Sequence, residues 1–131
     1  MINAHIPESY VESLTLRLDV YRRIADIRNK EASLDVKDEL KDRFGEIPES
    51  VLGLIDIALI RNCANAMGIY EIRQTDTNVL LFVKEIKSPK VIELLSRLNG
   101  RAMLSAGNKP YITIRCGGGS SLDMLKKVFK I

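Results

Sequence analysis

The sequence has little of the residue types that most often carry enzyme chemistry. It contains one histidine, His5, and two cysteines, Cys63 and Cys116, which are far apart in the chain. Zinc sites use cysteines and histidines at short, regular spacings, and no such spacing is present. Two distant cysteines are also not typical of a disulfide framework. The sequence therefore argues against a zinc enzyme and against a secreted, disulfide-stabilised domain.

Long apolar runs and recognisable signals are missing as well. The longest apolar stretch, 51–60, includes Asp56 and is too short to cross a bilayer. The N-terminus lacks the basic-then-apolar pattern of a signal peptide. The run 117–121 is rich in glycine, but a nucleotide-binding P-loop would need a lysine that comes here only at Lys126. We expect a cytoplasmic protein without a membrane partner, in which this run is a flexible turn before a serine-capped helix, with weak anion binding there as the alternative.

The charges are distributed unevenly along a chain that is otherwise typical of a globular domain. Apolar residues make up 46% of its 131 residues, which suffices for a core. Residues 1–83 carry 10 basic and 14 acidic side chains, whereas residues 84–131 carry 10 basic and 3 acidic ones. Such a basic half is either an ordinary solvated surface or a surface that meets an acidic partner or nucleic acid.

Aromatic residues are too few near the basic half to predict single-strand recognition. They make up 5% of the chain, and readers of single strands interleave aromatic with basic residues. The aromatic residues of this region are Phe82, Tyr111 and Phe129. Nucleic-acid binding therefore remains the alternative hypothesis, and the contacts expected for it are Lys126, Lys127 and Lys130.

Apolar periodicity at steps of three and four residues predicts three helices in the first half. The first spans 12–29, with an apolar stripe of Leu14, Leu18, Tyr21 and Ala25 that Leu16, Val20, Ile24 and Ile27 widen. The second spans 34–44, with Ser33 as its N-cap. The third spans 48–67 and is apolar around most of its circumference, so we expect it to be the central, buried helix.

The pattern after Gly68 predicts strands. Four runs have strand-like patterns, at 69–74, 79–83, 102–104 and 111–115, and two more helices are predicted from 88 to about 98 and from 120 or 121 to about 130. Three helices followed by a β-β-α-β-β-α order predict an α+β fold with a small, mostly antiparallel sheet. We expect a tail over 1–11 and one domain over 12–131, divided into a helical part (12–68) and a β-β-α-β-β-α part (69–131).

The joint between the second and third predicted helices is the most informative segment. Gly45 suits the left-handed residue just past a helix end. Pro48 suits the first turn of the next helix, where its missing N–H is not needed. Phe44 flanks the corner and can fix it by packing. The joint therefore predicts a rigid corner between a charged helix and an apolar one.

An acidic surface is predicted just before this joint. Glu39 and Asp42 lie three residues apart on a helix and so share one face, which Asp35 and Asp38 extend. Carboxylates in pairs match the planar guanidinium of arginine. The surface is either an ordinary solvated helix face, partly paired with neighbouring basic residues, or a docking surface for arginines of another domain.

Two segments resemble a known family. Leu16–Ala25 (Leu-Arg-Leu-Asp-Val-Tyr-Arg-Arg-Ile-Ala) and Glu39–Pro48 (Glu-Leu-Lys-Asp-Arg-Phe-Gly-Glu-Ile-Pro) are similar to the C-terminal domain of the bacterial transcription-repair coupling factor. The lead-in 6–10, the apolar run 54–61 and the helix end 67–69 fit as well. The resemblance covers nearly the whole chain and is most specific over residues 6–69.

The resemblance implies a non-catalytic domain of a large ATP-dependent DNA translocase from the bacterial cytoplasm. Such a translocase removes stalled RNA polymerase from DNA and recruits excision repair. ATP and Mg²⁺ belong to its motor module, and no cofactor is implied for this domain. The domain is expected to fold back on the N-terminal repair-protein-like module and to mask its binding site for the damage-recognition ATPase. Family acids that face arginines of that module match Glu39 and Asp42.

Three hypotheses follow from the sequence. The leading one is an autoinhibitory, non-catalytic domain of a coupling factor. The second is a nucleic-acid-binding accessory domain that uses the basic C-terminal half. The third, an enzyme or small-ligand domain, has the least support because the sequence lacks a nucleophile paired with a base.

Overall fold

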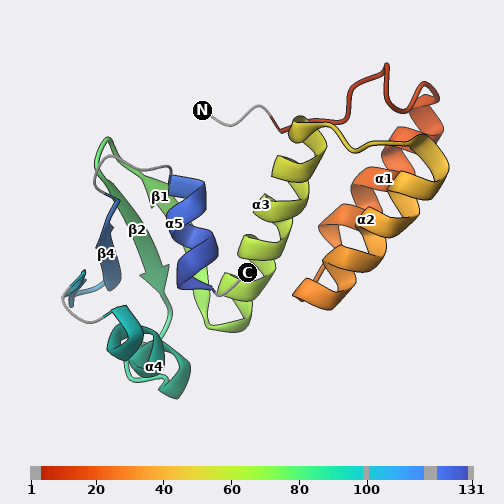
Figure 1. Ribbon diagram of the computed structural model, residues 1–131. Helices are drawn as coiled ribbons and strands as arrows, with labels where there is room; N and C mark the ends of the chain where they lie inside the picture. Colours follow the sequence, from red (N-terminus) through yellow and green to blue (C-terminus); the bar gives the residue numbers. More distant parts are fainter. Residues whose placement is uncertain (1–3, 99–100, 117–120, 130–131) are drawn as a thin grey trace. The chain divides into compact units, whose positions relative to one another are not determined.

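The computed structural model describes residues 4–98, 101–116 and 121–129. The chain divides into two compact units, 1–62 and 63–131. In the described residues it forms five helices and a four-stranded antiparallel sheet, in the order α1-α2-α3-β1-β2-α4-β3-β4-α5 (Figure 1). The predicted α+β fold, with a helical first part and a β-β-α-β-β-α second part, is confirmed.

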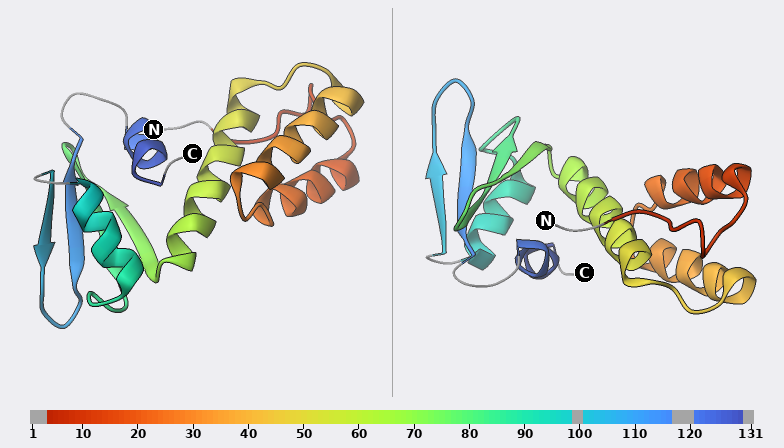
Figure 2. Two further views of the ribbon diagram at one scale, coloured as in Figure 1. Left: turned by 60° about the horizontal axis from the view of Figure 1, so that its bottom comes forward. Right: turned by 90° about the horizontal axis from the view of Figure 1, so that it is seen from above.

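The first unit is built from α1 (Leu14–Ala25), α2 (Lys30–Phe44) and the part of α3 (Glu49–Ala66) up to Asn62. Helices α1 and α2 lie side by side in every view (Figures 1 and 2). Its core includes six helical side chains that are at most 5% exposed, Val20, Ile24, Val36, Leu40, Val51 and Ile55. Apolar side chains at helical spacing thus hold the unit together.

Helix α1 faces the core with only part of the apolar stripe predicted for it. Leu14 and Leu18 are 63% and 48% exposed, so their assignment to the core was wrong. Val20 and Ile24, which widen the predicted stripe, are buried, followed by Ile27 just beyond the end of the helix. The apolar residues of this helix thus form two adjoining stripes, one with Leu14 and Leu18 and one with Val20 and Ile24. The contacts with the rest of the unit select one of them.

Helix α2 begins four residues earlier than predicted. Asn29 is its N-cap, and the Asn29 side chain accepts a hydrogen bond from the Ala32 N–H at 2.8 Å. Ser33, predicted as the cap, is buried inside the helix, and its hydroxyl donates to the Lys30 carbonyl at 2.6 Å. Both residues are good caps, but a serine can also satisfy its hydroxyl within a helix. The earlier cap therefore adds a full turn to α2.

The joint between α2 and α3 has the backbone that its residues predict. Gly45 has φ +88°, and its N–H donates to the Lys41 carbonyl at 3.0 Å. The Pro48 carbonyl accepts the first hydrogen bonds of the next helix, from the N–H groups of Val51 and Leu52 at 3.0 Å. The Tyr10 hydroxyl also reaches this corner, 2.9 Å from the Gly45 carbonyl oxygen. The corner is therefore fixed by backbone geometry and by a distant side chain.

The residues before α1 pack against the first unit. Ile6 and Val11 are 4% and 1% exposed, although they lie in or at the end of the segment expected to be a tail. The Ile6 N–H donates to the Tyr21 hydroxyl at 2.9 Å. Tyr10 places its ring 5.8 Å from that of Phe44. These contacts hold the segment against α1 and the α2–α3 joint.

The second unit contains the sheet and two helices. The sheet has the order β1-β2-β4-β3, formed by β1 (Ile69–Gln74), β2 (Asn78–Val83), β3 (Ala102–Ser105) and β4 (Tyr111–Arg115). Helices α4 (Pro89–Leu98) and α5 (Ser121–Val128) lie on the same side of it (Figure 2). The core side chains on this side are Val79, Leu81, Ile112 and Ile114, all 0% exposed, with Val91 and Leu94 from α4.

Some predicted features lie outside the described residues. These are the glycine run 117–119 with Ser120, and Lys130. In the part of the chain that the structure describes, no helix is long and apolar enough to cross a membrane.

Candidate functional site: the acidic face of α2

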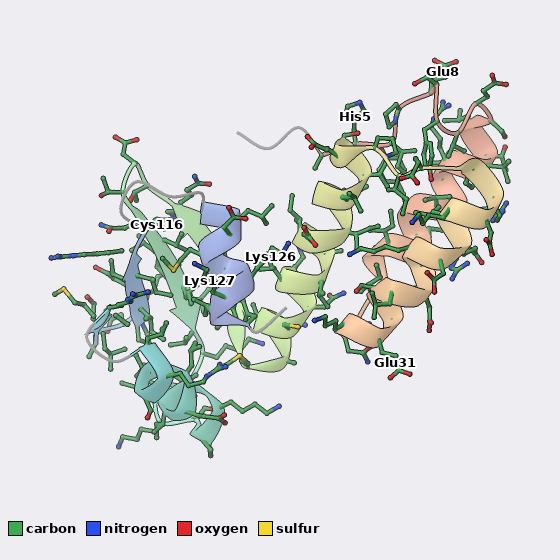
Figure 3. The ribbon with its side chains drawn as sticks, in the orientation of Figure 1. His5, Glu8, Glu31, Cys116, Lys126 and Lys127 are labelled. Carbon is green, nitrogen blue, oxygen red and sulfur yellow. The ribbon has the colours of Figure 1, made fainter. Side chains whose placement is uncertain are left out.

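Helix α2 presents a continuous row of acids on the side opposite its core contacts. Ser33, Val36 and Leu40 form its buried side. Four acids, at successive steps of four, three and four residues, lie on the opposite side because a helix turns by 3.6 residues. All four are exposed, and we call them the acidic stripe: Glu31, Asp35, Asp38 and Asp42. Figure 3 shows the Glu31 side chain at the start of α2, pointing away from the helices of this unit.

The stripe agrees with three acids singled out in the sequence and adds a fourth. Asp35, Asp38 and Asp42 were grouped by their spacing, and Glu31 continues the same spacing by one turn. Glu31 was missed because the helix was expected to begin at residue 34. Correct placement of the N-cap at Asn29 would have revealed it.

The stripe carboxylates have no partner of their own within the described residues, where none of the four forms an ion pair or a hydrogen bond. They span about 16 Å along the helix axis, and their like charges repel one another. Asp42 is also in the last turn, where the helix dipole disfavours an acid. The row therefore costs local stability, and a basic partner would relieve that cost.

Glu39 has a different environment from the stripe. Its carboxylate bonds the guanidinium of Arg23 on α1 and lies 3.8 Å from that of Arg43 on its own helix. The hydrogen bond with Arg23 lowers the pKa of Glu39, and the charge of Arg43 adds to this effect. Glu39 thus links α2 to α1 through an ion pair. Asp42, with which it is grouped in the sequence, is exposed on the stripe.

The lysines of the alternative hypothesis lie in a different unit. Lys126 is half-buried and Lys127 is exposed on α5, and both are labelled in Figure 3. Helix α5 also carries Asp123 in its first turn. The structure therefore places these two lysines beside one acid of the same helix.

The residues considered for chemistry are divided between the two units, His5 in the first and Cys63 and Cys116 in the second. His5 is exposed, and Cys63 and Cys116 are half-buried free thiols. Burial raises the pKa of the Cys63 thiol, so less of it is present as the reactive thiolate. Within the described ranges, no group of three or more His, Cys, Asp or Glu side chains could hold a metal ion.

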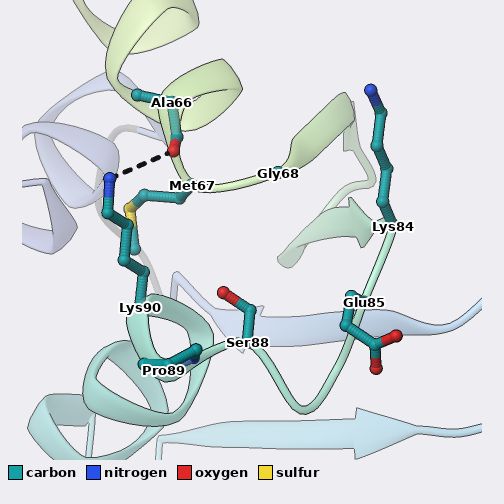
Figure 4. Close-up of a pocket in the computed structure, with 8 residues that line it drawn as sticks. All are labelled: Ala66, Met67, Gly68, Lys84, Glu85, Ser88, Pro89 and Lys90. Atoms are coloured by element: carbon teal, nitrogen blue, oxygen red, sulfur yellow. Dashed lines mark hydrogen bonds between the residues drawn. The ribbon is translucent and has the colours of Figure 1, made fainter.

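A pocket of about 390 Å³ lies in the second unit, beside the start of α4 (Figure 4). It is lined by Ala66, Met67, Gly68, Lys84, Glu85, Ser88, Pro89 and Lys90. The Lys90 ammonium donates to the Ala66 carbonyl at 3.4 Å. Lys84 extends on the other side of the pocket from Lys90 (Figure 4). The pocket is therefore an open recess with separated charges and does not place an acid against a base.

Comparison with known proteins identifies the family. Residues 1–94 match the family model of the TRCF domain. The chain belongs to the TRCF domain family. The resemblance stated from the sequence motifs is therefore confirmed, and the acidic stripe lies within the matched residues of this TRCF domain.

The relatives of the TRCF domain are coupling factors. The transcription-repair-coupling factor of Rickettsia prowazekii (strain Madrid E) is 30% identical over 110 residues, which cover 82% of this chain and 10% of the relative. That of Bacillus subtilis (strain 168) is 29% identical over 133 residues, covering 97% and 11%. The TRCF domain thus spans about a tenth of the length of these relatives.

A solved structure shares the fold of the TRCF domain. It is described as the C-terminal domain of transcription-repair coupling factor, with a TM-score of 0.82 and 20% identity. The match covers 98% of this chain and 84% of the other. The α+β architecture is therefore that of a known C-terminal domain.

Proposed function

We propose that this TRCF domain is a non-catalytic, autoinhibitory domain of a coupling factor. The acidic stripe docks on arginines of the N-terminal repair-protein-like module of the parent chain and masks that module's binding site for the damage-recognition ATPase. The observation that carries the proposal is the stripe itself, a row of four exposed carboxylates without partners in the described residues. Arginine is the best match to such carboxylates because its planar fork can bond two oxygens at once.

The energies of such contacts suit a releasable lock. One exposed ion pair contributes about 0.2–1 kcal/mol, so four of them contribute roughly 1–4 kcal/mol. A tethered partner has an effective concentration on the order of millimolar, which favours the closed state without any further contact. Competition by the damage-recognition ATPase, or by salt, can then open it.

The test is a charge reversal in a coupling factor that carries this domain. Asp42→Lys should raise the affinity for the damage-recognition ATPase and raise basal ATPase activity. Asp42 is preferred to Glu39, because removal of Glu39 would also break its contact with Arg23. The matched control is Asp76→Lys, which makes the same charge change in the exposed turn after β1.

Double reversal of Asp38 and Asp42 should release the lock further. The domain should remain folded, because both side chains are exposed and opposite the core. The proposal is wrong if the reversals leave both the affinity and the basal activity unchanged. It is equally wrong if Asp76→Lys has the same effect as Asp42→Lys.

A further inference from the structure

The sheet of the second unit has one covered face and one open face. Val79 and Leu81 of β2 and Ile112 and Ile114 of β4 are 0% exposed. They therefore point to the covered face, on the side where α4 and α5 lie (Figure 2). Side chains alternate along a strand, so the residues between these point to the opposite face. On the two central strands they are Leu80, Phe82, Tyr111, Thr113 and Arg115. Neither α4 nor α5, the helices of this unit that pack on the sheet, lies on this open face (Figure 2).

The open face carries a contiguous group of aromatic rings. The Phe82 ring lies 6.3 Å from that of Tyr70 and 5.3 Å from that of Tyr111, between ring centroids. The guanidinium carbon of Arg73 lies 4.8 Å from the centroid of the Phe82 ring. We call Tyr70, Phe82 and Tyr111 the aromatic platform. Three of the four aromatic residues of this unit are thus gathered on the side of the sheet that α4 and α5 do not cover.

The platform is accessible at its ends. Phe82 is only 8% exposed because its neighbours cover it, but Tyr70 is 47% exposed. Tyr70 stands at an irregularity in the β1–β2 register, between Ile69 and Glu71. A bulge of this kind redirects a side chain. At this irregularity β1 places the Tyr70 ring beside Phe82. Because Tyr70 remains 47% exposed, core packing does not explain why an aromatic residue stands there.

Positive charge surrounds the platform. Arg115 follows Tyr111 and Thr113 on the same face, and Arg101 lies beside Arg115, which donates its backbone N–H to the Arg101 carbonyl at 3.4 Å. Both arginines are exposed. The acid on this face, Glu71, is bonded by the guanidinium of Arg73 at 2.6 and 3.1 Å. The residues 63–131 carry 11 basic and 5 acidic side chains, so the surrounding field is positive.

We propose that the open face binds single-stranded nucleic acid, with bases on the aromatic platform and phosphates on Arg101 and Arg115. A four-stranded sheet can present aromatic rings on which two or three bases stack, and a positive surface holds the backbone. An acidic protein segment would use the arginines but would leave the exposed ring of Tyr70 without a role. This site lies on the opposite side of the sheet from α5, so it is distinct from Lys126 and Lys127. It also does not depend on the acidic stripe.

The experiment measures fluorescence anisotropy of labelled single-stranded DNA and RNA oligonucleotides of mixed sequence with the 131-residue chain at low salt. Tyr70→Ala and Tyr111→Ala should each weaken binding by about five-fold or more, since stacking of one base on an aromatic ring contributes at least that factor. Tyr70→Phe should bind as the unchanged chain does, because the ring is kept. The DNA and RNA arms show which backbone is preferred.

The charges are tested by the salt dependence. Log affinity falls linearly as log salt rises. The double variant Arg101→Gln and Arg115→Gln should make this fall shallower by about 1.4 in slope, or about 0.7 for each phosphate that an arginine no longer neutralises. The matched control is Lys126→Gln with Lys127→Gln, which removes the same charge from α5. This control should leave the slope nearly unchanged if the arginines hold the phosphates.

Folding of each variant is checked by circular dichroism. If Tyr111→Ala does not fold, the exposed Tyr70 variant decides the test, together with quenching of tyrosine emission by the oligonucleotide in a chain that has no tryptophan. The proposal is overturned if neither oligonucleotide binds saturably, or if the alanine variants bind as the unchanged chain does. It is also overturned if the α5 control weakens binding as much as the arginine variant, or if polyglutamate displaces the oligonucleotide as well as unlabelled oligonucleotide does.

Discussion

Asn62 of α3 is expected to be one of the most important polar side chains of the first unit. Its amide nitrogen donates to the carbonyl of Ala25 at 3.1 Å and to that of Ile27. Ala25 is the last residue of α1, and the final carbonyls of a helix have no partner within it. One side chain of α3 therefore satisfies the end of α1. Replacement by alanine removes both donors and leaves the carbonyls in place.

The expected cost follows from these contacts. A hydrogen bond contributes about 0.5–1.5 kcal/mol net, and an unsatisfied, partly buried carbonyl raises the loss. Two bonds therefore give about 2 kcal/mol. Alanine is the better helix former by up to about 0.7 kcal/mol, which offsets part of the loss. We expect Asn62→Ala to lower the free energy of unfolding by about 1.5 kcal/mol.

Urea unfolding followed by circular dichroism measures this change. For an m-value of about 2 kcal/mol per molar, the midpoint should fall by roughly 0.7 M. The control is Asn65→Ala, which makes the same substitution at an exposed position of α3. It should be neutral or slightly stabilising, because only the helix preference changes there.

The comparison of the two asparagines can refute this reasoning. If Asn62→Ala and Asn65→Ala shift the midpoint equally, then the two carbonyls gain nothing from the Asn62 side chain. A lower m-value for Asn62→Ala, with the midpoint unchanged, would also contradict it, because the loss should appear as stability and not as a change in the surface exposed on unfolding.

Three further predictions concern α2 and its ends, each measured by urea unfolding. Asn29→Ala should cost about 1 kcal/mol by removing the N-cap, and Ser33→Ala should cost less; the reverse order would show that Asn29 is not the cap. Gly45→Ala should cost about 1–3 kcal/mol because φ is +88° at this position, which strains a residue that has a Cβ. The cost should come from the backbone and not from a clash, since no atom lies within 4 Å of an added Cβ. A neutral result would contradict that geometry. Glu39→Gln should lose the stability that the ion pair with Arg23 contributes. This loss should be greatest above pH 4.5, the ordinary pKa of the carboxyl group, and should vanish as the pH falls through the lowered pKa of Glu39 in the folded chain. An equal loss at acidic and neutral pH would exclude the ion pair as its cause.

Local chemistry predicted the elements that depend on it. Strand 111–115 was predicted with its observed ends, because Ile112 and Ile114 alternate with Thr113 and match the period of a strand. The end of α2 was predicted because Gly45 adopts a backbone that other residues avoid. Pro48 marked the beginning of α3 for a different reason, because its missing N–H is not needed where a helix starts. In these places one or two residues determine the backbone.

The remaining features depend on contacts between distant residues. The partner of Glu39 is Arg23, sixteen positions earlier on another helix, and no periodicity within α2 points to it. The aromatic platform depends on strand register and on the irregularity at Tyr70, which places residues 70 and 111 beside the same ring. Spacing alone could not show that Tyr70 and Tyr111 meet there.

The strand order β1-β2-β4-β3 also has a consequence for how the second unit folds. The outer ladders are hairpins that close over short turns, whereas the central ladder joins Asn78 to Arg115, 37 positions apart. Closing that long loop costs more chain entropy than forming either hairpin, and distant pairings form slowly. Because the fully buried residues of β2 and β4 meet only across this ladder, we expect the core of the unit to assemble in that step, after both hairpins have formed.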